Sequence, residues 1–167
     1  LAANGAISSV NSGDLRLRII SENTRLDSLN GGAGVARGQF VIQDSTGRKA
    51  TVNLRADDVQ TVGDVLRTIN RLHLGARAEL NATGDGILLR DTAGGASTLT
   101  VSESGGTTAR DLGLLRASKR VEVEGQSQQV LDGTMTYTIA IGASDSLADL
   151  KGRINALGAG FSASVLT

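Results

Sequence analysis

Apolar and polar residues alternate at two places in the chain that lie 85 residues apart. The alternating apolar residues are Val52, Leu54 and Ala56 at the first place and Tyr137, Ile139 and Ile141 at the second. A period of two is typical of a strand with one buried face. The sequence therefore predicts a strand at each place.

Each predicted strand leads into a segment with the periodicity of an amphipathic helix. Thr61 and Ser146 are the expected N-caps, with Asp64 and Asp149 as the acidic partners of capping boxes. Apolar residues then follow at i, i+3, i+4 and i+7, so we expect each helix to bury one stripe. The stripe residues are Val62, Val65, Leu66, Ile69 and Leu72 in the first helix and Leu147, Leu150, Ile154 and Leu157 in the second.

A glycine and a second alternating segment follow each helix. Gly75 and Gly160 are expected to adopt the left-handed conformation that releases a chain from a helix. The strand residues expected next are Ala76, Ala78 and Leu80 in the first segment and Phe161, Ala163 and Val165 in the second. Because residues 51–80 and 136–165 match without a gap, the sequence predicts one strand–helix–strand unit used twice.

Further short elements surround the first copy. We expect a hairpin from Phe40–Ile42 through the loop Asp44–Gly47, a turn over Asn81–Gly86 and a strand at Ile87–Leu89. A turn over 91–95 then leads to Leu99 and Val101, and Thr108–Asp111 forms a short helix ended by Gly113. At the start, Leu15, Leu17 and Ile19 alternate like the last strand of a preceding unit.

These elements predict an α+β fold with short, mostly antiparallel strands and amphipathic helices packed on one face. Its building block is a duplicated ββαβ-type unit. The predicted segments are 1–35, a connector or the tail of an earlier unit; 36–117, the first unit; and 118–167, a shorter second unit. Because the chain begins without Met, we expect a fragment of a longer protein.

Composition narrows the classes of function. Trp and Cys are absent, so the core must come from small aliphatic residues, and disulfides and Cys nucleophiles are excluded. The 17 basic and 17 acidic residues balance, which disfavours nucleic-acid binding. No apolar run approaches the ~18 residues of a membrane helix, so no membrane insertion is expected. With 22 Gly and no Pro, many tight turns are expected.

Candidate chemistry is sparse. His73 is the only histidine, and its place at a helix end favours capping or solvation over catalysis. Asp57 and Asp58 lie in a predicted turn before a helix, where carboxylates favour the positive end of the dipole. The glycine-rich segment 31–38 lacks the third glycine of a dinucleotide fingerprint. Asp85 and Asp91 lie in turns without a calcium-loop pattern, and Asn81-Ala82-Thr83, a glycosylation tripeptide, is assigned to a turn.

We therefore expect no catalytic, cofactor-binding or metal-binding residues and no cofactor, and the chain is not expected to be an enzyme. A triad would need a base, and only His73 could supply it.

The two copies resemble the flagellin hook IN motif family. The residues that carry the resemblance are Thr61–Val65 through Ile69-Asn70, Ser146–Leu150 through Ile154-Asn155, and the segments Gly75–Ala78 and Gly160–Ala163. Asn81–Leu89 and Ala109–Leu114 are similar to stretches of flagellar filament cap and other hook-associated proteins. The resemblance covers about residues 21 to 167.

The resemblance implies a secreted, structural, surface-exposed outer domain of a bacterial flagellum, with a role in motility. Its implied partners are other flagellar axial proteins, and the full-length protein would form a homo-oligomer. The implied location is extracellular. The alternative function is a bacterial surface adhesion or carbohydrate-binding module, against which the scarcity of aromatic side chains counts.

Overall fold

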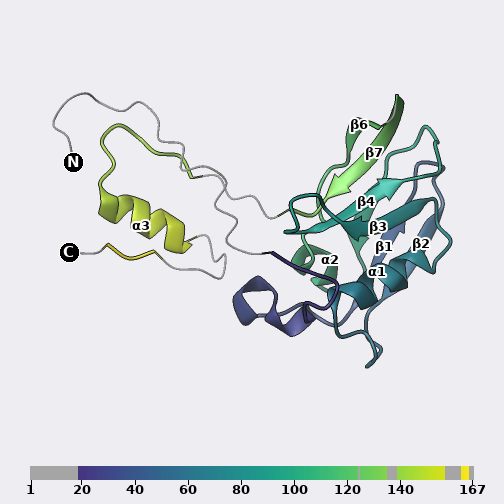
Figure 1. Cartoon of the computed structure of the whole chain (residues 1–167), viewed down its shortest axis with the longest axis horizontal. Helices are drawn as coiled ribbons and strands as arrows, with labels where there is room; N and C mark the ends of the chain where they lie inside the picture. Colours follow the sequence, from purple (N-terminus) through teal and green to yellow (C-terminus); the bar gives the residue numbers. More distant parts are fainter. Residues whose placement is uncertain (1–18, 124, 135–138, 157–162, 166–167) are drawn as a thin grey trace. The chain divides into compact units, whose positions relative to one another are not determined.

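The computed structural model describes residues 19–123, 125–134, 139–156 and 163–165 (Figure 1). By their contacts, the residues divide into two compact units. The outer unit is Ile19–Thr136, and the terminal unit combines Leu1–Arg18 with Tyr137–Thr167. Each unit is described by itself below.

The outer unit contains seven strands, two α-helices and two short 3-10 helices among its described residues. The 3-10 helices are η1 (Leu26–Ser28) and η2 (Asn30–Gly32), and the α-helices are α1 (Val62–Asn70) and α2 (Thr108–Asp111). The strands are β1 (Gln39–Gln43), β2 (Lys49–Asn53), β3 (Ala76–Leu80), β4 (Ile87–Asp91), β5 (Thr100–Glu103), β6 (Lys119–Val123) and β7 (Gln126–Asp132).

The strands form two antiparallel sheets. One has three strands in the order β2-β1-β5, and the other has four in the order β3-β4-β7-β6. Helix α1 contacts β3 and β2, while α2 contacts β5 and β1. The predicted α+β class with short antiparallel strands is confirmed, as is the hairpin through Asp44–Gly47.

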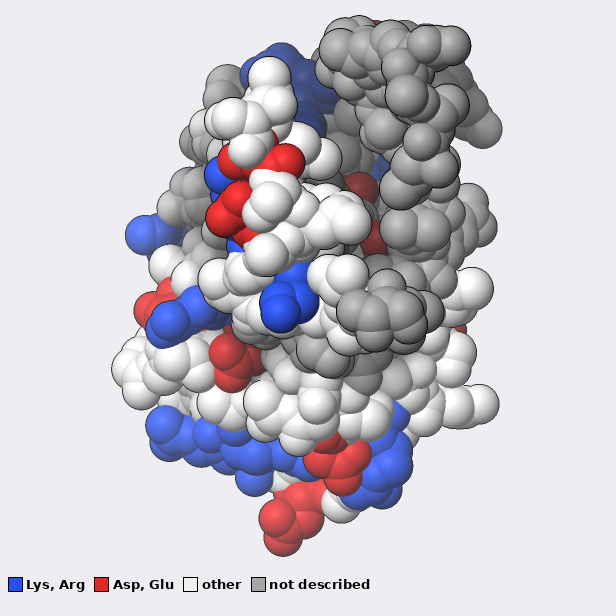
Figure 2. Space-filling model, turned by 90° about the vertical axis from the view of Figure 1, so that its left-hand side faces the viewer, with Lys and Arg blue, Asp and Glu red and all other residues white. Residues whose placement is uncertain are grey.

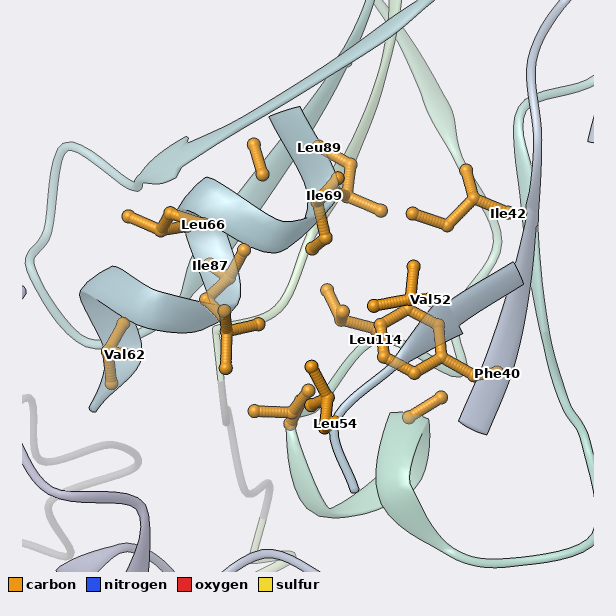
Figure 3. Packing of buried hydrophobic residues seen from close by; sticks show 14 of the residues in the cluster. Phe40, Ile42, Val52, Leu54, Val62, Leu66, Ile69, Ile87, Leu89 and Leu114 are labelled. Carbon is orange, nitrogen blue, oxygen red and sulfur yellow. The ribbon is translucent and has the colours of Figure 1, made fainter. Parts of the chain in front are cut away.

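One hydrophobic core fills the outer unit. It contains the α1 stripe together with aliphatic residues from both sheets, and Phe40 on β1 is its largest side chain (Figure 3). Val62, Val65 and Ile69 are at most 1% exposed, so the predicted burial of the first helix stripe is confirmed. The other labelled core residues are Ile42, Val52, Leu54, Leu66, Ile87, Leu89 and Leu114.

The β6–β7 hairpin belongs to the outer unit. These strands were not among the predicted elements. Val121 and Val123 alternate before Gly125, which turns the chain with a φ of 76°. Strand β7 pairs with β4, so the core residue Leu131 lies beside Leu89. By its contacts, the chain divides between residues 18 and 19 and between residues 136 and 137.

Helix α1 ends at a different left-handed residue from the one predicted. His73 has the positive φ, 51°, whereas Gly75 does not. Gly75 is needed for another reason, because a Cβ there would lie 2.3 Å from the Cβ of Ala93. Strand β2 also ends before Ala56, which is exposed in the turn ahead of α1, since the chain must reverse there to begin the helix.

The described part of the terminal unit contains one helix, α3 (Leu147–Ala156). None of its residues is buried, so the predicted buried stripe of the second helix is wrong. Residues 139–141 and 163–165 were predicted as strands but form none, because no described strand pairs with them. Tyr137, Leu157, Gly160 and Phe161, which belong to the same predictions, lie outside the described residues.

Charges of both signs lie on the face shown in Figure 2, with uncharged surface between them. Within the described ranges, no helix is both long and apolar enough to cross a membrane.

Candidate functional site

The two copies of the repeat share a helix N-terminus built in the same way. At α1, the Asp64 N–H donates to the Thr61 hydroxyl (3.2 Å), and the Thr61 N–H donates to the Asp64 carboxylate (2.8 Å). At α3, the Asp149 N–H donates to the Ser146 hydroxyl (3.2 Å), and the Ser146 N–H donates to the Asp149 carboxylate (2.9 Å). Both predicted capping boxes are therefore present, and each satisfies two backbone donors at the helix end.

Hydrogen bonding at these caps stabilises the charged carboxylates. The Thr61 hydroxyl, followed by the N–H groups of Gln60 and Thr61, lowers the pKa of Asp64 well below its usual value. The hydroxyl and N–H of Ser146 lower the pKa of Asp149 in the same way. Both groups are therefore ionised at neutral pH and act as caps rather than as proton donors.

A second shared device holds each helix to the chain that follows it. The Asn70 side-chain amide donates to the Ala78 carbonyl (2.9 Å) and accepts from the Ala78 N–H (2.8 Å). Asn155 makes the same pair of bonds to Ala163, at 3.2 Å and 2.7 Å. We call each pair of bonds an asparagine clamp.

Ile-Asn is part of the repeated sequence pattern, but the pattern alone predicts no role for the asparagines. The signal that could have found the clamp is an asparagine at the same position of both copies, eight residues before an alanine, Ala78 or Ala163. An amide side chain has one donor and one acceptor group, as a peptide has, so it can pair with both backbone groups of one residue.

The two copies differ in the burial of the helix face. We call Leu147, Leu150 and Ile154 the α3 face. Leu147 is 64% exposed, whereas its counterpart Val62 is 0% exposed. Helix α3 therefore has an apolar stripe like that of α1, but no other described element buries it. Among the described residues, the α3 face is the candidate interaction site.

A polar turn joins the two ends of the outer unit. The Ile20 N–H donates to the carbonyl of Gly84 (2.7 Å), close to where the unit begins. Near its end, the Thr134 hydroxyl donates to Asp85 (3.1 Å), while the buried Asn81 amide donates to Asp85 (2.8 Å) and Asp132 (3.0 Å). The turn Asn81–Gly86 therefore holds both ends, and we call it the end clasp.

The carboxylates of the end clasp are also held in the charged form. Burial by itself would raise the pKa of Asp85 and Asp132. Hydrogen bonds outweigh this effect and lower both pKa values, from Thr83, Asn81 and Thr134 to Asp85 and from Asn81 and Thr134 to Asp132. The side-chain amide of Asn81 is hydrogen-bonded within this network, so Asn81 has a structural role in the predicted turn.

A second buried network fixes the β1–β2 hairpin loop. Asp91 accepts from the N–H (2.9 Å) and hydroxyl (2.7 Å) of Ser45, and Asp44 accepts from the Gly75 N–H (3.0 Å). Burial alone would raise the pKa of Asp44, but hydrogen bonds from Thr46, Gly75 and Arg48 lower it. The Asp91 carboxylate, which the sequence offers as a possible calcium ligand, thus accepts hydrogen bonds from the N–H and hydroxyl of Ser45.

The other candidate residues predicted from the sequence lie on the surface. His73 is exposed just after α1, and Asp57 and Asp58 are exposed in the turn before it. The segment after η2 leads into β1, and the guanidinium of Arg37 donates to the Val59 carbonyl. Among the described residues, no group of three or more His, Cys, Asp or Glu side chains could hold a metal ion.

Comparison with protein-family models, with curated proteins and with solved structures finds no match to this chain. The resemblance to the flagellin hook IN motif therefore depends on the residues of the two copies alone.

Proposed function

We propose that this chain is a structural, surface-exposed domain of an extracellular flagellar hook-associated, cap or filament protein, which mediates subunit or surface contacts without catalysis. The observation that supports the proposal is the repeat itself. Both copies combine the residues of the hook IN motif with a capping box and an asparagine clamp. A duplicated element whose shared side chains fix the backbone at both ends of a helix suits a structural building block.

The repeat is suited to this task because its local geometry does not depend on burial. The clamp and the cap are formed at α3, none of whose residues is buried, as well as at α1, whose stripe is buried. A helix fixed in this way keeps an apolar face in a defined orientation for a neighbouring subunit. The partners implied by the proposal are other flagellar axial proteins or further copies of the full-length protein.

The location of the source protein tests the proposal. Gly125, in the β6–β7 turn, is exposed and has open space around it, so an epitope inserted there should leave the fold intact. Immunogold labelling of intact cells is expected to mark the hook, the filament or its tip. The same insertion in a strain without flagellar export is the control and should abolish the external label.

Label on the cell envelope of cells with unlabelled flagella would contradict the flagellar location. Envelope label together with retention of glycans by the immobilised chain would favour the adhesion or carbohydrate-binding alternative.

A further inference from the structure

Among the described residues, Asn30 is the only asparagine that is followed by glycine. In such a pair the glycine nitrogen can attack the side-chain amide carbon of the asparagine, because glycine has no Cβ to hinder the approach. The pair Asn30-Gly31 lies in η2, where Asn30 is half-buried and Gly31 is exposed. The sequence therefore directs asparagine deamidation to one position of the outer unit.

The structure holds the reactive amide in place. The side-chain nitrogen of Asn30 donates to the carbonyl of Gly34 (2.9 Å) and to the carbonyl of Asp111 in α2 (2.9 Å). An amide nitrogen has two hydrogens, so both are in use. For the attack, the side chain must rotate over its own backbone toward Gly31, which breaks these two bonds.

Two further hydrogen bonds hold the same segment against α2. The Ala36 N–H donates to the Asp111 carboxylate (3.0 Å), and the Thr108 hydroxyl donates to the Ala36 carbonyl (3.0 Å). We call the three bonds between residues 30–36 and α2, including the one from Asn30 to Asp111, the α2 tie. Release of Asn30 therefore requires the α2 tie to open at least locally.

The reaction itself needs only water. The Gly31 nitrogen bonds to Cγ of Asn30, the bond from Cγ to the side-chain nitrogen breaks, and ammonia leaves with the proton of the Gly31 N–H. The product is a five-membered succinimide ring. Water opens the ring at either carbonyl and leaves aspartate or isoaspartate at position 30.

Neither product can restore the α2 tie. An aspartate carboxylate is ionised at neutral pH and accepts hydrogen bonds without donating any. At position 30 it would place oxygen atoms against the carbonyl oxygens of Gly34 and Asp111. Isoaspartate adds one carbon to the main chain and also carries a carboxylate. The change is therefore irreversible, because the amide donor is lost.

We propose that Asn30 is a deamidation site whose reaction is limited by opening of the α2 tie, and that the reaction permanently releases residues 30–36 from α2. The site does not depend on the proposed flagellar location.

Peptide mass spectrometry of the full chain, incubated at neutral pH, measures the loss of the Asn30 amide. The reaction is expected to be about tenfold slower in the folded chain than in a synthetic peptide of residues 25–36, because the tie must open first. Thr108→Val removes the hydroxyl bond to Ala36 and keeps the size of the side chain, so it should speed the reaction about fivefold.

Asn70→Ala is the matched control, because it weakens the outer unit at the first asparagine clamp and leaves the α2 tie intact. It should not change the rate at Asn30. If it speeds the reaction as much as Thr108→Val does, deamidation follows unfolding of the whole outer unit and the proposal is wrong. An Asn30 amide that stays intact in the Thr108→Val chain while the peptide reacts would overturn the site itself.

Asn30→Asp reproduces one product and tests the release of the segment. Hydrogen exchange of the Ala36 amide is expected to become about tenfold faster, because the bond from residue 30 to Asp111 is lost. Asn23→Asp is the control, since it adds the same charge at an exposed asparagine seven residues earlier in the chain. Equal exchange of the Ala36 amide in the two variants would contradict the release.

Discussion

The side chains of Asn70 and Asn155 hydrogen-bond to backbone groups in the way that a neighbouring strand does in a sheet. Each side chain pairs with the N–H and the carbonyl of one later residue, Ala78 or Ala163. Aspartate could accept the N–H but could not donate to the carbonyl, and alanine could do neither. The requirement for a donor and an acceptor on one short side chain explains why both copies have asparagine at this position.

Loss of the first clamp should destabilise the outer unit. Asn70→Ala removes two partly buried hydrogen bonds, so we expect the free energy of unfolding to fall by about 1–2 kcal/mol. Urea denaturation of the full chain measures this. Asn53→Ala, which removes one exposed bond to the Arg55 N–H, is the control and should cost less than about 0.5 kcal/mol. Equal effects of the two substitutions would argue against the clamp.

The carboxylates of the end clasp make stability depend on pH. Their folded-state pKa values are lowered, so the unfolded chain binds protons more readily than the folded chain does. The stability that they contribute is complete above the unfolded pKa, about 4, and is lost as pH falls through the folded pKa. We expect the free energy of unfolding to be constant near neutral pH and to decline below about pH 4.

Asp85→Asn identifies the contribution of one of these carboxylates. The variant should be less stable than the original chain at pH 7 and should lose less further stability between about pH 4 and pH 2. Urea denaturation at a series of pH values checks both expectations. An unchanged slope in the acid range would show that Asp85 does not contribute to the acid sensitivity.

At the scale of elements, Gly75 and Gly152 differ in whether the surrounding structure leaves room for a side chain. Gly75 lies where β3 meets the hairpin loop, and an added Cβ would lie 2.3 Å from the Ala93 Cβ and 2.9 Å from an Asp44 carboxylate oxygen. A Cβ added at Gly152, in the interior of α3, would have no atom within 4 Å apart from the backbone of its own helix. Gly75 is therefore dictated by packing, whereas Gly152 only weakens its helix.

Alanine substitutions should separate these two cases. Gly75→Ala is expected to destabilise the outer unit by about 1–3 kcal/mol because neighbouring groups must move. Gly152→Ala should stabilise α3 by about 0.5–1 kcal/mol because alanine loses less backbone freedom in a helix. Urea denaturation reports the first change, and amide exchange in α3 reports the second. A stabilising Gly75→Ala would contradict the packing at Ala93.

Local pattern predicted the elements of the first copy well because tertiary contacts agree with it. The α1 cap, its buried stripe and the β1–β2 hairpin follow from residue spacing alone. Burial of the α3 face did not follow, because the same spacing gives a buried stripe only where another element covers it. The asparagine clamps and the end clasp were also missed, since each depends on a contact between residues whose pairing no local period encodes.

At the scale of the whole molecule, the outer unit has the features of a separately folded insertion. All residues of its hydrophobic core lie between Ile20 and Leu131, and both of its ends are held by one turn. Strand β7 completes the four-stranded sheet beside β4, so the unit depends on residues well beyond the first repeat. Domains with neighbouring ends and their own core tolerate insertion into another domain.

Residues 19–136, produced alone, should therefore fold. We expect one cooperative urea transition and amide NMR shifts in β1, β4 and α1 like those of the full chain, because the core and the end clasp are both retained. Residues 36–117 are the matched control. They lack β6, β7 and the fully buried Leu131, which leaves the β4 edge and part of the core uncovered, so a folded spectrum is not expected. If the shorter segment folded as well as the longer one, the hairpin β6–β7 would be dispensable and the boundaries at 19 and 136 would not mark the folding unit.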